Sequence, residues 1–265
     1  MWKISIQRII LTFMKLKELD KFLRDKLVLD DFSFDASLNG IQIASSDKDI
    51  NKIGHAVDAS LATIKKAAEA GCDMLFVHHG LFWGDSIRID GPHYDRVKTC
   101  LDNDMALYAC HLPLDAHPVF GNNAQMAQCL GIKSYDMFSD YKGKKIGVKG
   151  KLPFPMTIDQ IVRLLDFSPD TGLKTLEFGK DLCETVGIVS GGAGNDVADA
   201  INDGLDLFIT GEIYHQNFHE ALENKINVIA GGHYQSETFG VKAVMRMVLG
   251  ELGIKGEFIS WPTAL

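Results

Sequence analysis

Two stretches of this chain decide its fold: IGHAVDASLATIKKAAEAGCDMLFVHHG, at residues 53–80, and VGIVSGGAGNDVADAINDGLDLFITGEI, at residues 186–213. They align without a gap, and Gly71 and Gly204 fall at the same place in both. Each stretch reads as a strand, a helix with apolar residues three or four positions apart, a glycine turn and a second strand. The closing runs MLFV and LFIT are continuously apolar, which is typical of buried parallel strands. The sequence therefore predicts an α/β fold with an internal duplication.

The similarity between the halves continues into the next helix and strand. RVKTCLDNDMALYACHLPLD, which ends at Asp115, parallels NFHEALENKINVIAGGHYQSE, which ends at Glu237. His111 aligns with His233 in this comparison, so both halves carry His-x-x-x-acid just beyond a predicted strand. A polar pair at the same place in two related units favours a shared site to which both halves contribute.

We expect the chain to form two related α/β lobes in a single compact unit. The first lobe is predicted over residues 14–132 and the second over residues 133–265, and no low-complexity linker separates them. Residues 1–13 are predicted to be an N-terminal extension, because Met14 opens the amphipathic helix MKLKELDKFLRDKL.

The composition argues against several classes of protein. The formal net charge of -8 disfavours a broad DNA- or RNA-binding surface, so no nucleic-acid partner is expected. The five cysteines are odd in number and form no CxxC pair, which argues against a disulfide framework and favours a cytoplasmic protein. The apolar patch near the N-terminus is too short to span a bilayer, so no membrane association is expected.

Histidines and carboxylates fall where the predicted strands end. The carboxyl ends of the strands in open α/β sheets line the crevice where ligands bind. Imidazole and carboxylate groups are common ligands of divalent transition metals. The pattern therefore predicts a metal site in the cleft between the lobes, with five candidate ligands: His78, His79, Asp115, His233 and Glu237.

The adjacent pair His78 and His79 needs an explanation, because neighbouring side chains of a strand point to opposite faces. The two can share one site where the strand ends, and Gly80 is expected to supply the backbone freedom for the turn. Alternatively, each imidazole serves a different ion of a close pair. Three histidines and two carboxylates suffice for two ions with a bridging carboxylate, an arrangement that suits hydrolysis.

The sequence assigns no catalytic residue, but it offers two candidates. His111 could be a metal ligand, a residue that orients a ligand, or a proton shuttle. Glu212, which aligns with His79, could be a general base or could orient a ligand, or it could simply favour a helix N-terminus. The glycine-rich loop SGGAGN, at residues 190–195, is expected to be a tight strand-to-helix turn, with phosphate contact as the alternative.

Four motifs together resemble those of a known family: VHHGLFW, HLPLDAH, TGEIYH and GGHYQSE. In order and spacing the chain is similar to the NIF-three-like (NGG-interacting-factor-like) proteins, also called GTP cyclohydrolase I type 2 homologues. The resemblance implies a two-lobed fold and a dinuclear divalent-metal site on the same five candidate ligands. It also implies a toroidal homohexamer, as in bacterial members, and a GTP cyclohydrolase-like activity.

We therefore expect two divalent metal ions per chain and a metal-dependent hydrolase that acts on a nucleotide or another small heterocyclic or phosphorylated substrate. The ligand types suit Zn, Fe, Mn, Ni or Co alike. Two alternatives stay open: a metal-handling protein without turnover, and an oligomeric scaffold in which the metals are structural. The openness of the site separates them, because a catalytic metal keeps a position for water.

Overall fold

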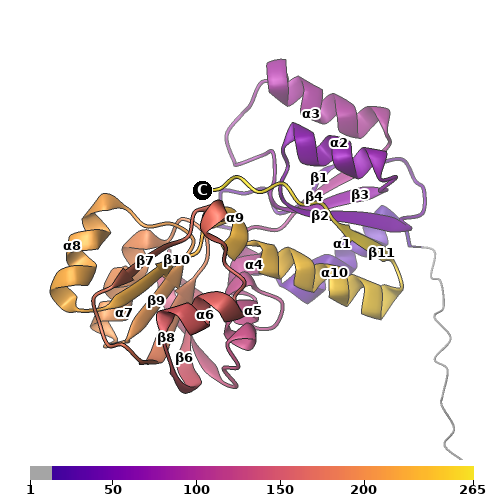
Figure 1. The fold of residues 1–265 in the computed structure, drawn as a ribbon. Helices are drawn as coiled ribbons and strands as arrows, with labels where there is room; N and C mark the ends of the chain where they lie inside the picture. Colours follow the sequence, from indigo (N-terminus) through magenta and orange to yellow (C-terminus); the bar gives the residue numbers. More distant parts are fainter. Residues whose placement is uncertain (1–13) are drawn as a thin grey trace, which may run out of the picture.

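The computed structural model describes residues 14–265, which form two β-sheets with helices on both faces of each (Figure 1). The prediction of a mixed α/β fold is confirmed. The extension predicted over residues 1–13 lies outside the described residues. Within the described part, no helix combines the length and the apolar character that a membrane crossing requires.

The first sheet has the strand order β1-β4-β3-β2-β11. β1 runs antiparallel to β4, and the other neighbours are parallel. The strands are β1 (Gly40–Ile43), β2 (Lys52–Asp58), β3 (Met74–His79), β4 (Ala106–Ala109) and β11 (Lys255–Phe258).

Helices cover both faces of the first sheet because its central strands are apolar on both sides. Along β3, Met74 and Phe76 belong to one core cluster, and Leu75 and Val77 belong to another, as the twofold alternation of a strand requires. The first cluster includes residues of α1 (Leu16–Leu27) and α10 (Thr238–Leu252). The second includes residues of α2 (Leu61–Glu69) and α3 (Gly91–Asp102).

The second sheet has the order β5-β6-β8-β9-β10-β7, in which only β8, β9 and β10 run parallel to one another. This lobe has two hydrophobic core clusters. One contains core residues of α5 (Asn122–Cys129) and α6 (Ile158–Leu164), and the second contains core residues of α7 (Val197–Asn202) and α8 (His215–Asn224). Thr157 is the N-cap of α6, because its side chain accepts a hydrogen bond from the Gln160 N–H. The strands are β5 (Tyr135–Tyr141), β6 (Lys144–Met156), β7 (Lys174–Glu177), β8 (Cys183–Val189), β9 (Leu207–Thr210) and β10 (Asn227–Ala230).

The two sheets share one arrangement of four strands. In the first, β2, β3 and β4 are parallel neighbours and β1 runs antiparallel beside β4. In the second, β8, β9 and β10 are parallel neighbours and β7 runs antiparallel beside β10. Short helices follow the third strand of each set: α4 (Leu112–Ala116) after β4, and α9 (His233–Ser236) after β10. Three 3-10 turns complete the elements: η1 (Leu29–Phe32), η2 (Pro169–Thr171) and η3 (Gly194–Asp196).

The C-terminal segment departs from the expected division of the chain at residues 132 and 133. The second sheet does begin near that boundary, at β5, but α10 and β11 return to the first lobe (Figure 1). β11 pairs in parallel with β2, with Lys255 opposite Lys52. α10 supplies Val241 and Val244 to the first core. The expected range 133–265 therefore contains an element of the first sheet, and the chain crosses between the lobes twice.

Candidate metal centre

The predicted site residues lie together at the ends of parallel strands, where α4 and α9 occupy the junction of the lobes (Figure 1). Six side chains, which we call the His–carboxylate cluster, form three overlapping groups of three. The ligand atoms of each group lie within 4.8 Å of one another. The groups are His78, His79 and His111; His79, His233 and Glu237; and His78, Asp115 and Glu237.

His78 and His79 both reach the cluster although they are neighbours in β3. Their ring centroids lie 4.6 Å apart at the end of the strand. Gly80 does not have the positive φ that a freely turning glycine would show, so its role differs from the one expected. A Cβ at Gly80 would lie 2.4 Å from the Gln42 amide, so a side chain here would have to displace that amide, whose Oε1 accepts a hydrogen bond from the Leu81 N–H.

The four imidazoles of the cluster share one pattern of hydrogen bonding. Each Nδ1 bonds to an oxygen that belongs to a carbonyl or a carboxylate, and such an oxygen accepts. In the neutral ring, Nδ1 therefore carries the proton and Nε2 keeps its lone pair for the site. The pairs are His78 with the Cys110 carbonyl at 3.0 Å, His79 with Asp58 at 2.8 Å, His111 with Asp35 at 2.9 Å, and His233 with Glu212 at 2.5 Å.

Asp115 is buried and held from one side. Its Oδ1 accepts hydrogen bonds from Asn122 Nδ2 and Ser190 Oγ, both at 2.9 Å. Its Oδ2 lies 3.5 Å from His78 Nε2. One oxygen is thus fixed by the protein, and the other is directed at the cluster.

Glu237 lies at the centre of the cluster and is only 3% exposed. Its Oε1 lies 3.1 Å from His233 Nε2 and 3.4 Å from His78 Nε2. Its Oε2 lies 3.3 Å from His79 Nε2. One carboxylate therefore faces three imidazoles, and its two oxygens serve different rings.

The charges of the cluster shift the pKa values of its members strongly. Burial alone would lower the pKa of His78, but the carboxylates of Asp115 and Glu237 raise it to about 10. Burial also opposes protonation of His233, yet Glu237 and Glu212 raise its pKa to about 9. For Glu237, burial would raise the pKa, and the imidazoles of His78 and His79 instead hold it well below its usual range.

The glycine-rich loop after β8 makes room for Glu237. Gly191 has a φ of +68°, and a Cβ there would lie 2.4 Å from Glu237 Oε1 and 3.3 Å from His233 Nε2. The Gly191 carbonyl accepts hydrogen bonds from the N–H groups of Gly211 and Glu212. The loop therefore supports the cluster through its backbone and depends on glycine to do so.

The cluster fits a metal ion better than it fits a closed hydrogen-bond network. His78 Nε2 and Glu237 Oε2 are buried and have no hydrogen-bond partner among residues 14–265. Leaving such a group unpaired costs about 1–3 kcal/mol. The cluster contacts of His78 and His79, at 3.3–3.5 Å, are longer than ordinary N–H···O hydrogen bonds. Imidazole and carboxylate donors without thiolate suit divalent Zn, Fe, Mn, Ni or Co.

The structure places the two catalytic candidates differently. His111 belongs to the cluster through its group with His78 and His79. Glu212 stands outside the three groups and accepts the Nδ1–H of His233, which is the orienting role considered for it.

The sequence reasoning missed two acidic residues that hold imidazoles. Asp58 accepts the Nδ1–H of His79. Its position could have been predicted, because Asp58 ends β2 directly opposite His79 in the parallel register. Asp35 holds His111 and lies in the loop before β1, where no periodic pattern or repeat marks it.

A two-sheet α/β fold whose strand ends carry a histidine–carboxylate cluster of metal-binding type defines the class of this protein. The chain belongs to the Duf34/NIF3 (NGG1p interacting factor 3) family, whose sequence pattern matches residues 14–260. The resemblance inferred from the four motifs is thereby confirmed.

Relatives and solved structures agree with this assignment. The chain is 44% identical over 237 residues to a Deinococcus radiodurans protein named GTP cyclohydrolase 1 type 2 homolog, with 87% of this chain and 88% of the relative covered. Protein ybgI, described as of unknown function, superposes with a TM-score of 0.86 at 33% identity over 95% of this chain and 100% of that one. A Thermus thermophilus protein superposes with a TM-score of 0.83 at 38% identity over the same shares.

Proposed function

We propose that the His–carboxylate cluster binds two divalent metal ions and that Glu237 would serve as a ligand in both subsites. The overlapping groups support two subsites, one formed by His78, Asp115 and Glu237 and the other by His79, His233 and Glu237. Only Glu237 belongs to both, and its two oxygens face different imidazoles. His111 adds a third imidazole near His78 and His79.

One observation carries this proposal: each imidazole is held at Nδ1 by an acceptor, while the Nε2 atoms of three of them face Glu237. Such acceptors fix the ring and its tautomer and strengthen the ligand, as at known metal sites. A structural network would have no need to leave buried Nε2 and carboxylate oxygens unpaired.

The cluster is open on one side, which favours a catalytic site over a closed structural one. The side chains of His78 and Glu237 are 0% and 4% exposed, but those of His79 and His233 are 19% and 31% exposed. A cleft of about 570 Å³ reaches the exposed edge of His79 and is lined also by Trp83, Arg96 and Trp261. A small substrate therefore has access to the cluster.

We infer a metal-dependent hydrolase that acts on a nucleotide or another small heterocyclic or phosphorylated molecule. Divalent ions in such a site lower the pKa of bound water and stabilise charge on the attacked group. Trp83 and Trp261 offer rings for stacking, and Arg96 offers a positive charge. His111, held by Asp35, is the group we propose for proton transfer, and Glu212 orients His233. The name of the Deinococcus relative is consistent with this class of reaction.

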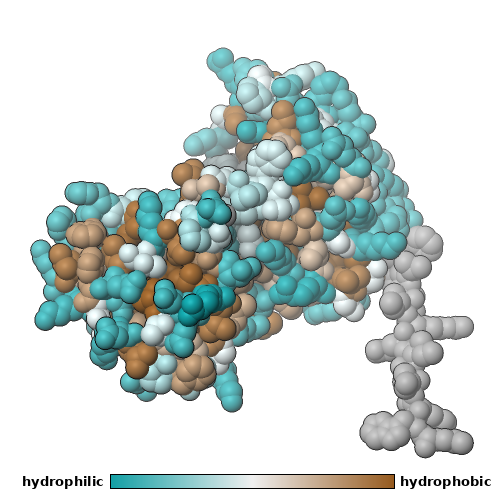
Figure 2. All heavy atoms as spheres, in the orientation of Figure 1, coloured by the Kyte–Doolittle hydropathy of each residue, from teal (hydrophilic) through white to brown (hydrophobic). Residues whose placement is uncertain are grey.

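We also propose that the two lobes arose by duplication and that the protein forms a homohexamer in the cytoplasm. The shared four-strand arrangement supports the duplication. Hydrophobic side chains gather on the visible face of the second lobe (Figure 2). In the same lobe, Phe154, Leu164 and Leu182 are each about half exposed. Such a surface suits contact between subunits. The five unpaired cysteines suit a reducing compartment.

A turnover assay tests the proposed activity. Protein loaded with Mn²⁺ or Zn²⁺ is incubated with GTP, other nucleotides and p-nitrophenyl phosphate, and the products are separated by chromatography. We expect turnover in the wild type, a loss of at least about 100-fold in Glu237→Gln, and wild-type rates in Glu223→Gln, a control on the exposed face of α8. Full metal occupancy without turnover of any substrate would contradict the hydrolase and favour a metal-handling protein.

A further inference from the structure

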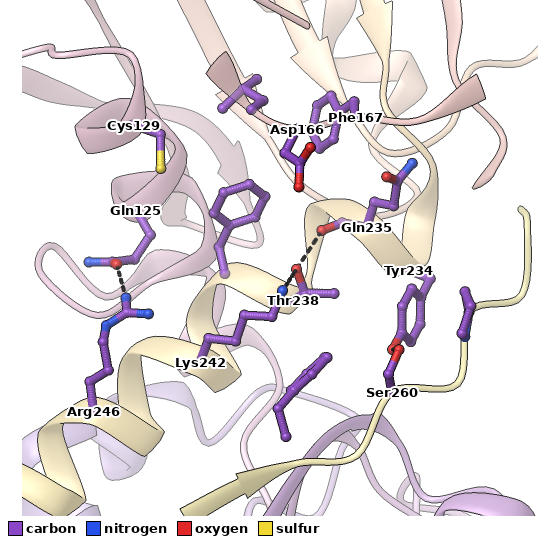
Figure 3. A pocket seen from close by; sticks show the side chains of 14 residues that line it. Gln125, Cys129, Asp166, Phe167, Tyr234, Gln235, Thr238, Lys242, Arg246 and Ser260 are labelled. Carbon is purple, nitrogen blue, oxygen red and sulfur yellow. Dashed lines mark hydrogen bonds between the residues drawn. The ribbon is translucent and has the colours of Figure 1, made fainter. Parts of the chain in front are cut away.

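A second pocket lies between the two lobes, apart from the His–carboxylate cluster (Figure 3). It has a volume of about 420 Å³, within the range of small-molecule sites. Its walls come from α5, the segment after α6, α10 and the tail that follows β11. We call it the interlobe pocket.

Two cations enter the interlobe pocket from the same face of α10. Lys242 and Arg246 are four residues apart and therefore lie one above the other on the helix. Lys242 is half-buried: its Nζ lies 3.3 Å from Thr238 Oγ1 and 4.6 Å from the centre of the Phe258 ring. Arg246 is exposed and donates to Gln125 Oε1 at 2.7 Å, as Figure 3 shows.

Within the part of the chain that the structure describes, these two cations are not neutralised by an ion pair. Among residues 14–265, neither Lys242 nor Arg246 forms an ion pair, and Asp166 is the only acidic residue that lines the pocket. Burial lowers the pKa of Lys242, Asp166 opposes that shift and Arg246 adds to it. Like charges one turn apart on a helix are unfavourable. With two cations and one carboxylate, the lining of the pocket carries a net positive charge, which favours an anionic ligand.

The remaining walls are apolar and aromatic. Phe167 and Phe239 meet edge to face, with their ring centres 6.2 Å apart, and Tyr234 and Phe258 also line the pocket. Aromatic walls favour a ligand with a planar or apolar body. The pocket therefore combines an anion-binding end with a surface for an organic ring.

We propose that the interlobe pocket binds a small organic anion, a carboxylate or a phosphate monoester with a planar or apolar body. Arg246 meets the anionic group at the exposed edge, and Lys242 holds it further in. The aromatic side chains contact the body of the ligand. The site is independent of the metals and of the hydrolase proposed above.

Isothermal titration calorimetry of the full-length protein tests this proposal with three probes: phenyl phosphate, benzoate and the neutral benzyl alcohol. We expect saturable binding of one or both anions and at least tenfold weaker binding of benzyl alcohol. Lys242→Met and Arg246→Gln each weaken anion binding at least tenfold. Lys65→Met, which removes the same charge from the exposed face of α2, leaves it unchanged. Stronger binding of phenyl phosphate than of benzoate identifies phosphate monoesters as the ligand class.

Several outcomes would overturn the proposal. One such outcome is that neither anion binds saturably, and another is that benzyl alcohol binds as tightly as the anions. Anion binding that persists in Lys242→Met but disappears in Glu237→Gln would place the anion at the His–carboxylate cluster instead. Because Tyr234 lines the pocket next to His233, the metal content of each variant is measured as well. Arg246→Gln alters an exposed side chain, so its result stands even if Lys242→Met fails to fold.

Discussion

At the scale of single residues, the cluster is defined as much by the groups behind the imidazoles as by the imidazoles themselves. Asp58, Asp35 and Glu212 each accept an Nδ1–H from outside the six-residue cluster. A carboxylate in this position makes an imidazole a stronger ligand and restricts its rotation. Two consequences can be measured.

Metal binding should release protons. The carboxylates hold the pKa of His78 near 10 and that of His233 near 9, so both rings are protonated in the metal-free protein at neutral pH. A metal needs the Nε2 lone pair, so each ring must lose a proton on binding. We expect release of about two protons per chain at pH 7, and an apparent affinity that falls up to about 100-fold for each pH unit lowered.

Titrations of metal into metal-free protein, in buffers of different ionisation enthalpy, measure this release. The same heat of binding in every buffer would show that no protons leave. That result would contradict the assignment of His78 and His233 as ligands.

The Asp58→Asn substitution should weaken metal binding without removing a ligand. An asparagine can still contact His79 but carries no charge to strengthen it. We expect about 10- to 100-fold lower metal affinity, measured by competition with a chelator. Asp25→Asn, on the exposed side of α1, is the matched control and should bind as the wild type does. Equal metal affinities of Asp58→Asn and Asp25→Asn would show that Asp58 does not strengthen metal binding.

At the scale of elements, the site depends on strand ends and on one glycine loop. Gly191→Ala should be damaging for two reasons: the positive φ costs about 1 kcal/mol, and the new Cβ collides with Glu237. Gly204→Ala is the control, because Gly204 has a φ of +65° and open space around it. Both variants should lose stability in urea unfolding, but only Gly191→Ala should lose metal. Retained metal in Gly191→Ala would show that the loop does not constrain Glu237.

The sequence predicts the strands and the cluster because their signals are local. The apolar run before His78 and the repeated His-x-x-x-acid pattern mark strand ends, and strand ends converge in an α/β fold. The positions of Asp58 and Gly191 are equivalent in the two repeats. Parallel pairing of β2 with β3 places Asp58 opposite His79, but no pattern in the sequence shows that Gly191 leaves room for Glu237. Asp35 lies in the loop before β1 and contacts a residue 76 positions away, and the loop has no periodicity to indicate this contact.

At the scale of the whole molecule, the C-terminal elements α10 and β11 join the two lobes. α10 contributes Val241 and Val244 to the first core, while Phe239 packs against a core of the second. The apolar pattern of this helix predicts burial, but it does not say against which sheet the helix packs. β11 then covers the edge of β2, where His55 lies opposite Phe258.

His55 should make the stability of the fold depend on pH. The ring is fully buried, and burial lowers its pKa from 6.5 to about 3, although the Ile53 carbonyl opposes the shift. The unfolded chain binds a proton near pH 6.5 and the folded chain does not, so stability is lost as the pH falls below 6.5. The loss between pH 6.5 and pH 4.5 amounts to about 2 kcal/mol.

Urea unfolding of metal-free protein at pH 6.5 and pH 4.5 measures this loss. His55→Gln should remove most of the His55 contribution from the difference, and the exposed His219→Gln should not. An unchanged pH dependence in His55→Gln would show that other groups are responsible.

The metal content per chain decides whether the His–carboxylate cluster is a dinuclear metal site. Elemental analysis is made on protein purified without a His-tag, for the wild type, Glu237→Gln and the control Glu223→Gln. We expect about two divalent ions per chain in the wild type and the control, and a clear loss in Glu237→Gln, because its carboxylate serves both subsites. A wild-type protein that contains no metal and takes up none when Zn²⁺, Mn²⁺ or Fe²⁺ is added would contradict this expectation.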